Sequence, residues 1–529
     1  MKKTIFWLIV IFGFSLVSFS CKKDKDSDSL DEKTVESKKF LSDISIDSVS
    51  ILNFYKKYPQ LNSYKNGVLD IYKNHNYNQI WFDKNGTVEF AHTLYNKYLD
   101  IEKEGLKADF PNNNDLELMF NSEEEHLDQL TSELLITNLY VYYANKVYKG
   151  LDEKVTSNIG WLLPRKQISY NSLLDTLLLH NNTSKVVEKK VLFNQYYKLQ
   201  SVLKKYRDIE KNGGWNTIEV DETFKNFKLG DSANAISQIR ERLFLVGDIA
   251  SNSKSNIYDE TLEKAIHHYQ KRNGLLVTST ILPKHIEEMN VPIGERIKKI
   301  MVNMERCRWI APDIASSKEL IVVNIPSFKL QFIREGKLEL ESPVVVGKTM
   351  NKTVIFSGKM SYIVFSPYWN VPTSIIQKEV KPGMAKNPNY LAQHNMEWNN
   401  GRVRQKPGIN NSLGLVKFIF PNSNNIYLHD TPSKSFFDKE SRAYSHGCVR
   451  VGKPRDLAIA ILRNDKNWTP EKIDKAMHKG IENSYVLKNK IPVYIGYFTA
   501  WVNEQGEICF FDDVYERDER LSKLLFTKN

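Results

Sequence analysis

A cysteine and one of two histidines toward the C-terminal end of the chain could together perform acyl transfer. Cys448 lies in the run Ser445–Arg450, with the sequence SHGCVR, and is one of 4 cysteines among 529 residues. The thiolate is the form of cysteine that attacks a carbonyl, and a free thiol has a pKa of about 8.5, so a base must take its proton near neutral pH. We therefore predict that Cys448 is the nucleophile of an acyl-transferring enzyme.

Two histidines could serve as that base. His446 lies two residues before Cys448, so the two side chains share a face if the backbone is extended. His429 lies further upstream in residues 426–432, IYLHDTP, which predict a strand that ends at a turn. An imidazole at either place could take the thiol proton and later return it to a leaving amine. The residues alone leave both histidines open.

The residues beside the nucleophile could stabilise charge during the reaction. Gly447 lets the backbone turn closely next to Cys448, and the N–H groups of Gly447 and Cys448 are natural donors to a tetrahedral oxyanion. Arg450 shares a face with the sulfur in extended backbone. It could lower the pKa of the thiol, hold a substrate carboxylate, or only tie its strand to the rest of the domain.

The elements that must position these residues form a β-rich domain over residues 300–500. From about residue 319 the apolar residues alternate, as in Ile321 and Val323, and Glu335-Gly336 predicts a hairpin turn. Residues 376–410 interrupt the strands with polar sequence, which predicts a lid or a substrate loop. Residues 501–529 are expected to pack on this domain as a C-terminal extension.

Two helical regions precede the β-rich domain. Residues 41–226 have apolar residues at three- and four-residue spacing and few Gly or Pro, which predicts a helical domain without a catalytic constellation. Residues 227–290 predict a small module of three helices, the third beginning near Pro283. The apolar faces of its first two helices are Ile236, Ile239, Leu243, Leu262, Ala265, Ile266 and Tyr269. The predicted fold class is α+β and multidomain.

The residues around Cys448 are part of a longer sequence pattern. His429, the run Ser445–Cys448 and Arg450 have the spacing of the L,D-transpeptidases, and this region resembles the YkuD-type catalytic domain of that family. Residues 227–290 resemble a peptidoglycan-binding module, although a plain bundle that braces its neighbours would have the same pattern. The resemblance extends to the long, scaffold-bearing members through the segments 323–326 (VNIP), 367–372 (PYWNVP), 402–408 (RVRQKPG), 411–414 (NSLG) and 417–422 (KFIFPN).

The resemblance implies a reaction and roles for named residues. Cys448 would form a thioester with the third residue of a peptidoglycan stem and expel D-alanine, and an amine of a second stem would take the acyl group in a 3–3 cross-link. His429 would be the base. The supporting motif residues would be Ser445, His446, Gly447 and Arg450. The expected substrate contacts are Tyr427, Trp369 and Asn411, with core packing as the alternative for the two aromatic residues. No metal or organic cofactor is implied.

The N-terminus predicts export. Lys2 and Lys3 precede an apolar stretch from Ile5 to Phe19, which is short for a bilayer span and suits a signal peptide over residues 1–20. Cys21 follows a small residue, which resembles a lipoprotein processing site and predicts lipidation of Cys21 and a place in the cell envelope or periplasm. An ordinary signal peptide and an uncleaved anchor are the alternatives. Residues 21–40 predict a flexible tether.

Composition narrows the expected partners. The net charge of +11 favours anionic partners, but the basic residues are spread along the chain, so no nucleic acid is expected. The expected partners are peptidoglycan stem peptides and glycan, and a membrane through the lipid anchor, while the oligomeric state stays open. The cysteines form no disulfide framework, and Cys307 and Cys509 could pair or remain free.

Other functions and other site chemistries also fit parts of the pattern. The same thioester could pass to water or to a D-amino acid, which would make the protein an L,D-carboxypeptidase or an exchange enzyme. A wall-binding anchor with a vestigial catalytic domain is a third hypothesis. Cys448 could be an inert core thiol, or could join His429 and His446 in a zinc site that lacks a clear fourth ligand.

Overall fold

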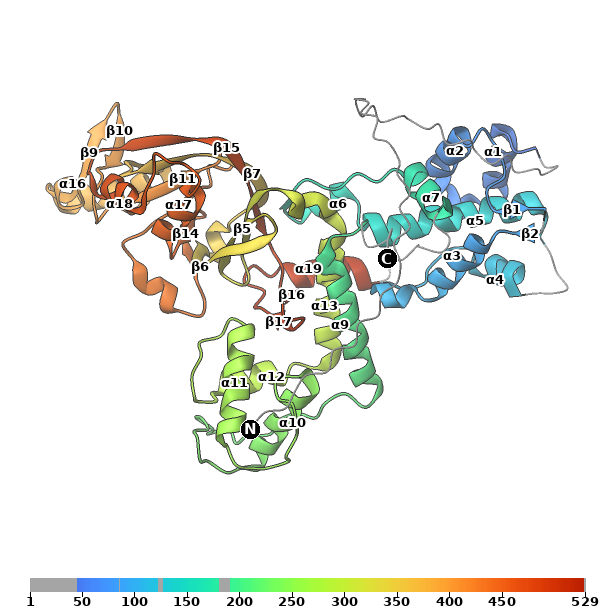
Figure 1. Ribbon diagram of the computed structural model, residues 1–529, viewed down its shortest axis with the longest axis horizontal. Helices are drawn as coiled ribbons and strands as arrows, with labels where there is room; N and C mark the ends of the chain where they lie inside the picture. Colours follow the sequence, from blue (N-terminus) through green and yellow to red (C-terminus); the bar gives the residue numbers. More distant parts are fainter. Residues whose placement is uncertain (1–44, 85, 122–126, 180–190, 528–529) are drawn as a thin grey trace, which may run out of the picture. The chain divides into compact units, whose positions relative to one another are not determined.

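The computed structural model describes residues 45–84, 86–121, 127–179 and 191–527 (Figure 1). The predicted signal peptide, the tether and the lipidation site at Cys21 lie outside the described residues. Within these ranges, none of the helices combines the length and apolarity that crossing a membrane would need.

The region up to residue 211 is helical, as its apolar spacing predicts. Helix α5 is buried on nearly all sides, so it forms the centre around which the other helices pack. A short hairpin of β1 (Phe82–Asp83) and β2 (Gly86–Thr87) also belongs to this region. The helices are α1 (Ser48–Lys57), α2 (Lys65–Asn74), α3 (Glu89–Leu99), α4 (Asn113–Asn121), α5 (Gln129–Tyr143), α6 (Glu153–Asn158), α7 (Tyr170–Leu179) and α9 (Asn194–Lys211).

The predicted three-helix module has a core of its own. Its helices are α10 (Asn234–Val246), α11 (Glu260–Arg272) and α12 (Pro283–Met289). All seven apolar positions predicted for the first two helices are buried in one cluster, which confirms the helical register. The side chain of Asp259 accepts a hydrogen bond from the backbone N–H of Leu262 and so caps the start of α11.

A long helix links this module to the β-rich domain. Helix α13 (Ile293–Trp309) packs along α9, and the predicted domain boundary at residue 300 falls inside it. Buried Arg308 of α13 donates to the carbonyl oxygen of Val147 and pairs with Glu305 at 2.9 Å. The sheet itself begins only at Glu319.

The β-rich domain is built on one ten-stranded sheet, as the period-two pattern predicts. The strand order is β11-β12-β14-β6-β5-β4-β15-β7-β3, β13 pairs with β6, and β11 also pairs with β7, so the sheet closes on itself. The predicted turn at Glu335-Gly336 is present, and both residues have the positive φ that a type I′ hairpin requires. The strands are β3 (Trp161–Leu162), β4 (Glu319–Asn324), β5 (Lys329–Arg334), β6 (Lys337–Gly347), β7 (Ile355–Phe365), β11 (Val416–Ile419), β12 (Leu428–His429), β13 (Ala443–Ser445), β14 (Val449–Val451) and β15 (Asn483–Gly496).

The insertion between β7 and β11 is folded. It contains a three-stranded sheet in the order β8-β10-β9 and short helices that share a separate apolar core, which includes Val371 and Val403. Its strands are β8 (Trp369–Asn370), β9 (Met396–Asn399) and β10 (Arg402–Gln405), and its helices are α14 (Thr373–Ile375), the π-helical turn Ile376–Val380, α15 (Lys381–Lys386) and α16 (Tyr390–Gln393).

The chain ends in segments that contact both the sheet and helix α13. Helices α17 (Pro454–Leu462) and α18 (Pro470–His478) precede β15, and β16 (Ala500–Val502), β17 (Ile508–Phe510) and α19 (Arg517–Phe526) follow it. Arg306 of α13 pairs with Asp518 at 2.6 Å, which fixes α19 against α13. Cys307 and Cys509 are buried free thiols, so the possible disulfide between them is absent.

Candidate active site

Two adjacent strands bring the predicted base and the predicted nucleophile to one face of the sheet. Strands β12 and β14 are parallel, with Leu428 opposite Val449 and His429 opposite Arg450. Side chains two residues apart in a strand share a face, so Cys448, which immediately precedes β14, lies on the face of Arg450 and His429. The backbone N–H of Val449 donates to the carbonyl oxygen of Tyr427 at 3.2 Å and fixes this register beside the thiol.

The turn that carries Cys448 is held by the Ser445 hydroxyl. Ser445 Oγ accepts from the Gly447 N–H at 3.1 Å and donates to the Cys448 carbonyl oxygen at 2.5 Å. Gly447 has a φ of 119°, a backbone conformation that side chains with a Cβ rarely adopt. The motif therefore needs serine and glycine at these places to form the turn.

The Gly447 N–H, a predicted oxyanion donor, has a hydrogen-bond partner within the turn. That N–H already donates to Ser445 Oγ. The Cys448 N–H makes no hydrogen bond to any described residue, which leaves it as the free donor next to the sulfur. The Cys448 N–H is therefore the stronger candidate for the oxyanion donor, and the part of Gly447 in binding the oxyanion stays a prediction.

Two residues outside the motif orient that donor. Thr353 Oγ1 donates to the Gly447 carbonyl oxygen at 2.9 Å and accepts from the Gly347 N–H at 2.8 Å. The hydroxyl of buried Tyr515 in turn accepts from the Thr353 N–H at 3.1 Å and donates to the Gly347 carbonyl oxygen at 2.6 Å. Because carbonyl and N–H point in opposite directions across a trans peptide, fixing the Gly447 carbonyl also fixes the Cys448 N–H.

His429 has the proton arrangement of a general base. Its side chain is 5 % exposed, and Nδ1 lies 2.5 Å from the carbonyl oxygen of Asp430. A carbonyl can only accept, so Nδ1 carries the hydrogen and Nε2 keeps a free lone pair. Burial, helped by the positive charge of Arg450, lowers the pKa of His429 to about 3, so the imidazole is neutral near pH 7.

The Cys448 thiol is protonated at rest. Burial raises its pKa above the usual range, although hydrogen bonds from Tyr427 and the charge of Arg450 oppose that shift. Sγ lies 3.7 Å from the carbonyl oxygen of Asn425, to which the thiol can donate its hydrogen. Burial also lowers the pKa of Arg450, whose Nε has no partner among the described residues. A neutral thiol therefore lies on one face with a neutral imidazole and a cation.

His446 occupies a different environment from His429. It is exposed, and its Nε2 lies 3.7 Å from Oε1 of Glu379 in the inserted subdomain. The side chain therefore faces the insertion and not the interior of the sheet. Among the described residues, no group of three or more His, Cys, Asp or Glu side chains could hold a metal ion, so the zinc site considered for His429, His446 and Cys448 is not formed.

Family models match two regions of the chain. The model described as L,D-transpeptidase catalytic domain matches residues 318–473, which contain the cysteine, both histidines and all strands of the sheet except β3 and β15. Residues 318–473 are an L,D-transpeptidase catalytic domain. The model described as Scaffold domain matches residues 66–203, within the helical region. The resemblance to the scaffold-bearing L,D-transpeptidases and the α+β multidomain fold class are both confirmed.

Individual proteins are similar to parts of the chain. A Haemophilus influenzae protein, named provisionally as an L,D-transpeptidase, is 36% identical over 246 residues, or 42% of this chain and 49% of that protein. The match thus spans about half of the relative's length. The match with a solved L,D-transpeptidase from Mycobacterium smegmatis covers 34% of this chain and 58% of that protein's chain. Its sequence identity is 12% and its TM-score is 0.20.

A second solved L,D-transpeptidase, from Stackebrandtia nassauensis, covers 53% of this chain and 96% of its own at 15% identity and a TM-score of 0.20. TM-scores this low do not support transferring geometry from either solved structure. The geometry of the site in this L,D-transpeptidase domain therefore comes from its own contacts.

The expected substrate contacts fall in three different environments. Tyr427 lies close enough to the nucleophile to affect the pKa of the Cys448 thiol, and its ring centroid is 5.7 Å from that of His429. Trp369 is half-buried against the small core of the insertion, which favours the packing alternative. Asn411 is fully buried, and its amide donates to the carbonyl oxygens of Pro367 and Lys406. The prediction that Asn411 contacts substrate is therefore replaced by a role in bracing the base of the insertion.

Substitutions of Thr353 test whether catalysis in the L,D-transpeptidase domain depends on the orientation of the Cys448 N–H. We expect Thr353→Val to lower kcat about tenfold with little change in KM, because it frees the Gly447 carbonyl without touching the substrate. Thr353→Ser keeps the hydroxyl and should restore kcat. Steady-state kinetics, normalised to titrated Cys448 thiol, checks both variants. Equal losses in the two variants would contradict the role of the hydroxyl.

The pKa shifts predict how Cys448 reactivity depends on pH. With the thiol pKa raised and the His429 pKa lowered, no thiolate–imidazolium pair exists at neutral pH, so alkylation by iodoacetamide should keep rising through about pH 9. No step should occur near the ordinary histidine pKa of about 6.5. Peptide mass spectrometry of Cys448 at a series of pH values measures this rate. A rate that is already high and flat from about pH 5 to pH 8 would contradict the neutral pair.

Proposed function

We propose that the protein is a peptidoglycan L,D-transpeptidase that forms 3–3 cross-links. The observation that carries the proposal is the His429 tautomer, because a hydrogen bond from Nδ1 to the Asp430 carbonyl leaves Nε2 as a base on the face that Cys448 occupies. The catalytic-domain match and the oriented Cys448 N–H support the same chemistry.

The first half-reaction would form a thioester. Nε2 of His429 takes the thiol proton as Sγ of Cys448 attacks the carbonyl carbon of the stem's third residue, normally a diamino acid. The Cys448 N–H donates to the oxyanion of the tetrahedral intermediate. The carbon–nitrogen bond to the terminal D-alanine then breaks, and the proton passes from Nε2 to the leaving amine. The enzyme is left acylated with a neutral His429.

The second half-reaction would pass the acyl group to an amine of another stem. Nε2 of His429 takes the proton of the attacking amine, the carbon–sulfur bond breaks, and the sulfur receives the proton back. The site before and after the cycle therefore has the same protonation. The inserted subdomain, which approaches the motif through Glu379 and His446, would act as the lid that admits the two stems.

The other regions would place this chemistry in the cell envelope. The signal segment would export the protein to the periplasm, and a lipid at Cys21 would anchor it to a membrane there. The module at residues 227–290 would bind peptidoglycan, and the surplus positive charge of +11 suits an anionic wall polymer. The helical scaffold domain would hold module and catalytic domain in one chain.

Product analysis tests the reaction. The mature protein is incubated with disaccharide tetrapeptides, and the products are followed by mass spectrometry. The proposal expects a cross-linked dimer together with one released D-alanine per cross-link. Tripeptide without dimer would make the protein an L,D-carboxypeptidase. Unchanged tetrapeptide, with an accessible Cys448 thiol, would make it a wall-binding anchor.

A further inference from the structure

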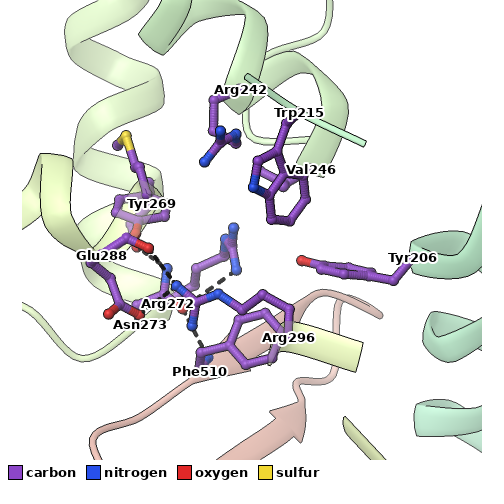
Figure 2. Close-up of a pocket in the computed structure, with 11 residues that line it drawn as sticks. Tyr206, Trp215, Arg242, Val246, Tyr269, Arg272, Asn273, Glu288, Arg296 and Phe510 are labelled. Atoms are coloured by element: carbon purple, nitrogen blue, oxygen red, sulfur yellow. Dashed lines mark hydrogen bonds and ion pairs between the residues drawn. The ribbon is translucent and has the colours of Figure 1, made fainter. Parts of the chain in front are cut away.

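A cavity remote from Cys448 in the chain lies between the three-helix module and helices α9 and α13 (Figure 2). Its empty volume is about 320 Å³, including space open to solvent. Three arginines and four aromatic residues line it, contributed by α9, α10, α11, α13, β17 and the segment before α10. Nothing in the proposed transpeptidation uses these residues, so the cavity needs an explanation of its own.

The three arginines of the cavity differ in their charge partners. Arg272 pairs with Asp248 at 2.5 Å, and Arg296 pairs with Glu288 at 2.8 Å. No carboxylate lies within ion-pair distance of Arg242 among the described residues. Two carboxylates thus face three guanidinium groups, which leaves one positive charge without a partner inside the wall of the cavity.

Arg242 also lacks hydrogen-bond partners. Its side chain is 4 % exposed, only Nη2 is engaged, donating to the carbonyl oxygen of Asn216 at 2.7 Å, and Nε and Nη1 are buried without a partner. The guanidinium lies 4.4 Å from the ring of Trp215, which holds it in place (Figure 2). A buried charged donor without a hydrogen bond costs more free energy than a neutral one. This position therefore favours the binding of a group that can accept hydrogen bonds from Arg242.

A neutral donor faces the same space. Figure 2 shows the hydroxyl of Tyr206 pointing into the cavity toward the arginines, and it makes no hydrogen bond to a described residue. Burial raises the pKa of Tyr206 to about 12, so the hydroxyl keeps its hydrogen near neutral pH. Burial, helped by the charge of Arg296, lowers the pKa of Arg242 to about 10, which still leaves that group charged. The cavity therefore offers donors and one unbalanced cation between aromatic walls.

We propose that this cavity binds a carboxylate, held by the free N–H groups of Arg242 and by the hydroxyl of Tyr206. A planar carboxylate matches the fork of a guanidinium, and its single negative charge balances the one unpaired cation. The aromatic walls suit a short apolar group next to the carboxylate. Such a ligand is either a free small acid or the C-terminal carboxylate of a peptide.

Isothermal titration calorimetry of the full chain carrying Cys448→Ser tests the proposal without any turnover. N-acetylalanine should bind, N-acetylalaninamide should not, and Arg242→Gln should weaken binding roughly 10- to 100-fold. Tyr206→Phe keeps the ring and should weaken binding a few-fold. Acetate binding as tightly as N-acetylalanine would identify a free small acid, and tighter binding of N-acetylalanine would identify a peptide terminus; both support the site.

Arg240 supplies the matched control on the same helix. It is equally buried, but it donates to the Ile257 carbonyl oxygen and pairs with Asp259 at 3.0 Å. Arg240→Gln should therefore lower the Tm and leave carboxylate affinity unchanged, whereas Arg242→Gln should weaken affinity with little loss of Tm. Equal binding of acid and amide, inorganic phosphate bound as tightly as N-acetylalanine, or no binding at all would overturn the proposal.

Discussion

Replacing Cys448 by serine should lower kcat for cross-linking by roughly 10⁴-fold or more, which is the scale of loss when an enzyme's nucleophile is removed. A serine hydroxyl ionises far less readily than a thiol, and neutral His429 is too weak a base to compensate. The substitution is nearly isosteric, so the turn held by Ser445 should persist. Mass spectrometric product assays of the purified variant and the parent protein measure the ratio.

Cys509 provides the control for the effect of the nucleophile. Its thiol is free and buried, and burial raises its pKa to about 11, so it does not act as a nucleophile near pH 7. Cys509→Ser makes the same chemical change in the C-terminal hairpin and should leave kcat within a few-fold of the parent. Comparable losses in both variants, or full activity of Cys448→Ser, would remove Cys448 from the mechanism.

The second large effect is expected at the base. His429→Gln should lower kcat/KM by roughly 10²- to 10⁴-fold, the usual contribution of general acid–base catalysis. A glutamine amide can still donate to the Asp430 carbonyl, but it has no lone pair that can accept the thiol proton. His446→Gln should change kcat/KM only a few-fold, because that side chain is exposed and faces Glu379.

Thioester formation separates the two histidines most clearly. The fraction of protein acylated in a single turnover, measured by intact mass, should fall sharply in His429→Gln and change little in His446→Gln. Circular dichroism melting of both variants controls for the burial of His429. If only the His446 variant loses thioester formation, the assignment of the base is wrong.

Features that depend on short stretches of chain could be predicted from the sequence. The turn at Glu335-Gly336 forms because its residues accept positive φ between alternating strands. The faces of α10 and α11 follow from the three- and four-residue spacing of their apolar positions. The sequence spacing between His429 and the cysteine motif indicates that the two lie together. In the structure, His429 and Arg450 of the motif are opposite each other on one pair of parallel strands.

Features that depend on distant contacts could not be predicted in this way. Strand β3 adds Trp161 of the helical region to the catalytic sheet opposite Ile355, and a two-residue strand leaves no periodic signal. Tyr515 reaches the catalytic turn through Thr353, although nothing in its local sequence indicates that contact. The hydrogen bond from the Gly447 N–H to Ser445 Oγ depends on how the turn folds, so the sequence does not indicate it.

The insertion shows the same limit on a larger scale. Its polar composition predicted a lid or loop, but scattered apolar residues such as Val371, Val380 and Val403 come together in a core of their own. Asn411 was matched by its segment to a family pattern, and only the structure reveals that its amide is used up by backbone carbonyls. Composition and motif spacing therefore predict where the site lies, but they do not predict the contacts that support it.

In the proposed reaction, Cys448 carries the acyl group between donor and acceptor. The most direct measurement quenches the reaction with disaccharide tetrapeptide in acid within one turnover, digests the protein with trypsin and analyses the peptide of residues 443–450. We expect a mass increase on Cys448 equal to the disaccharide tripeptide acyl group, and neutral hydroxylamine should remove it, as it removes a thioester. Cross-linked product that accumulates while Cys448 stays unmodified at every quench time would contradict it.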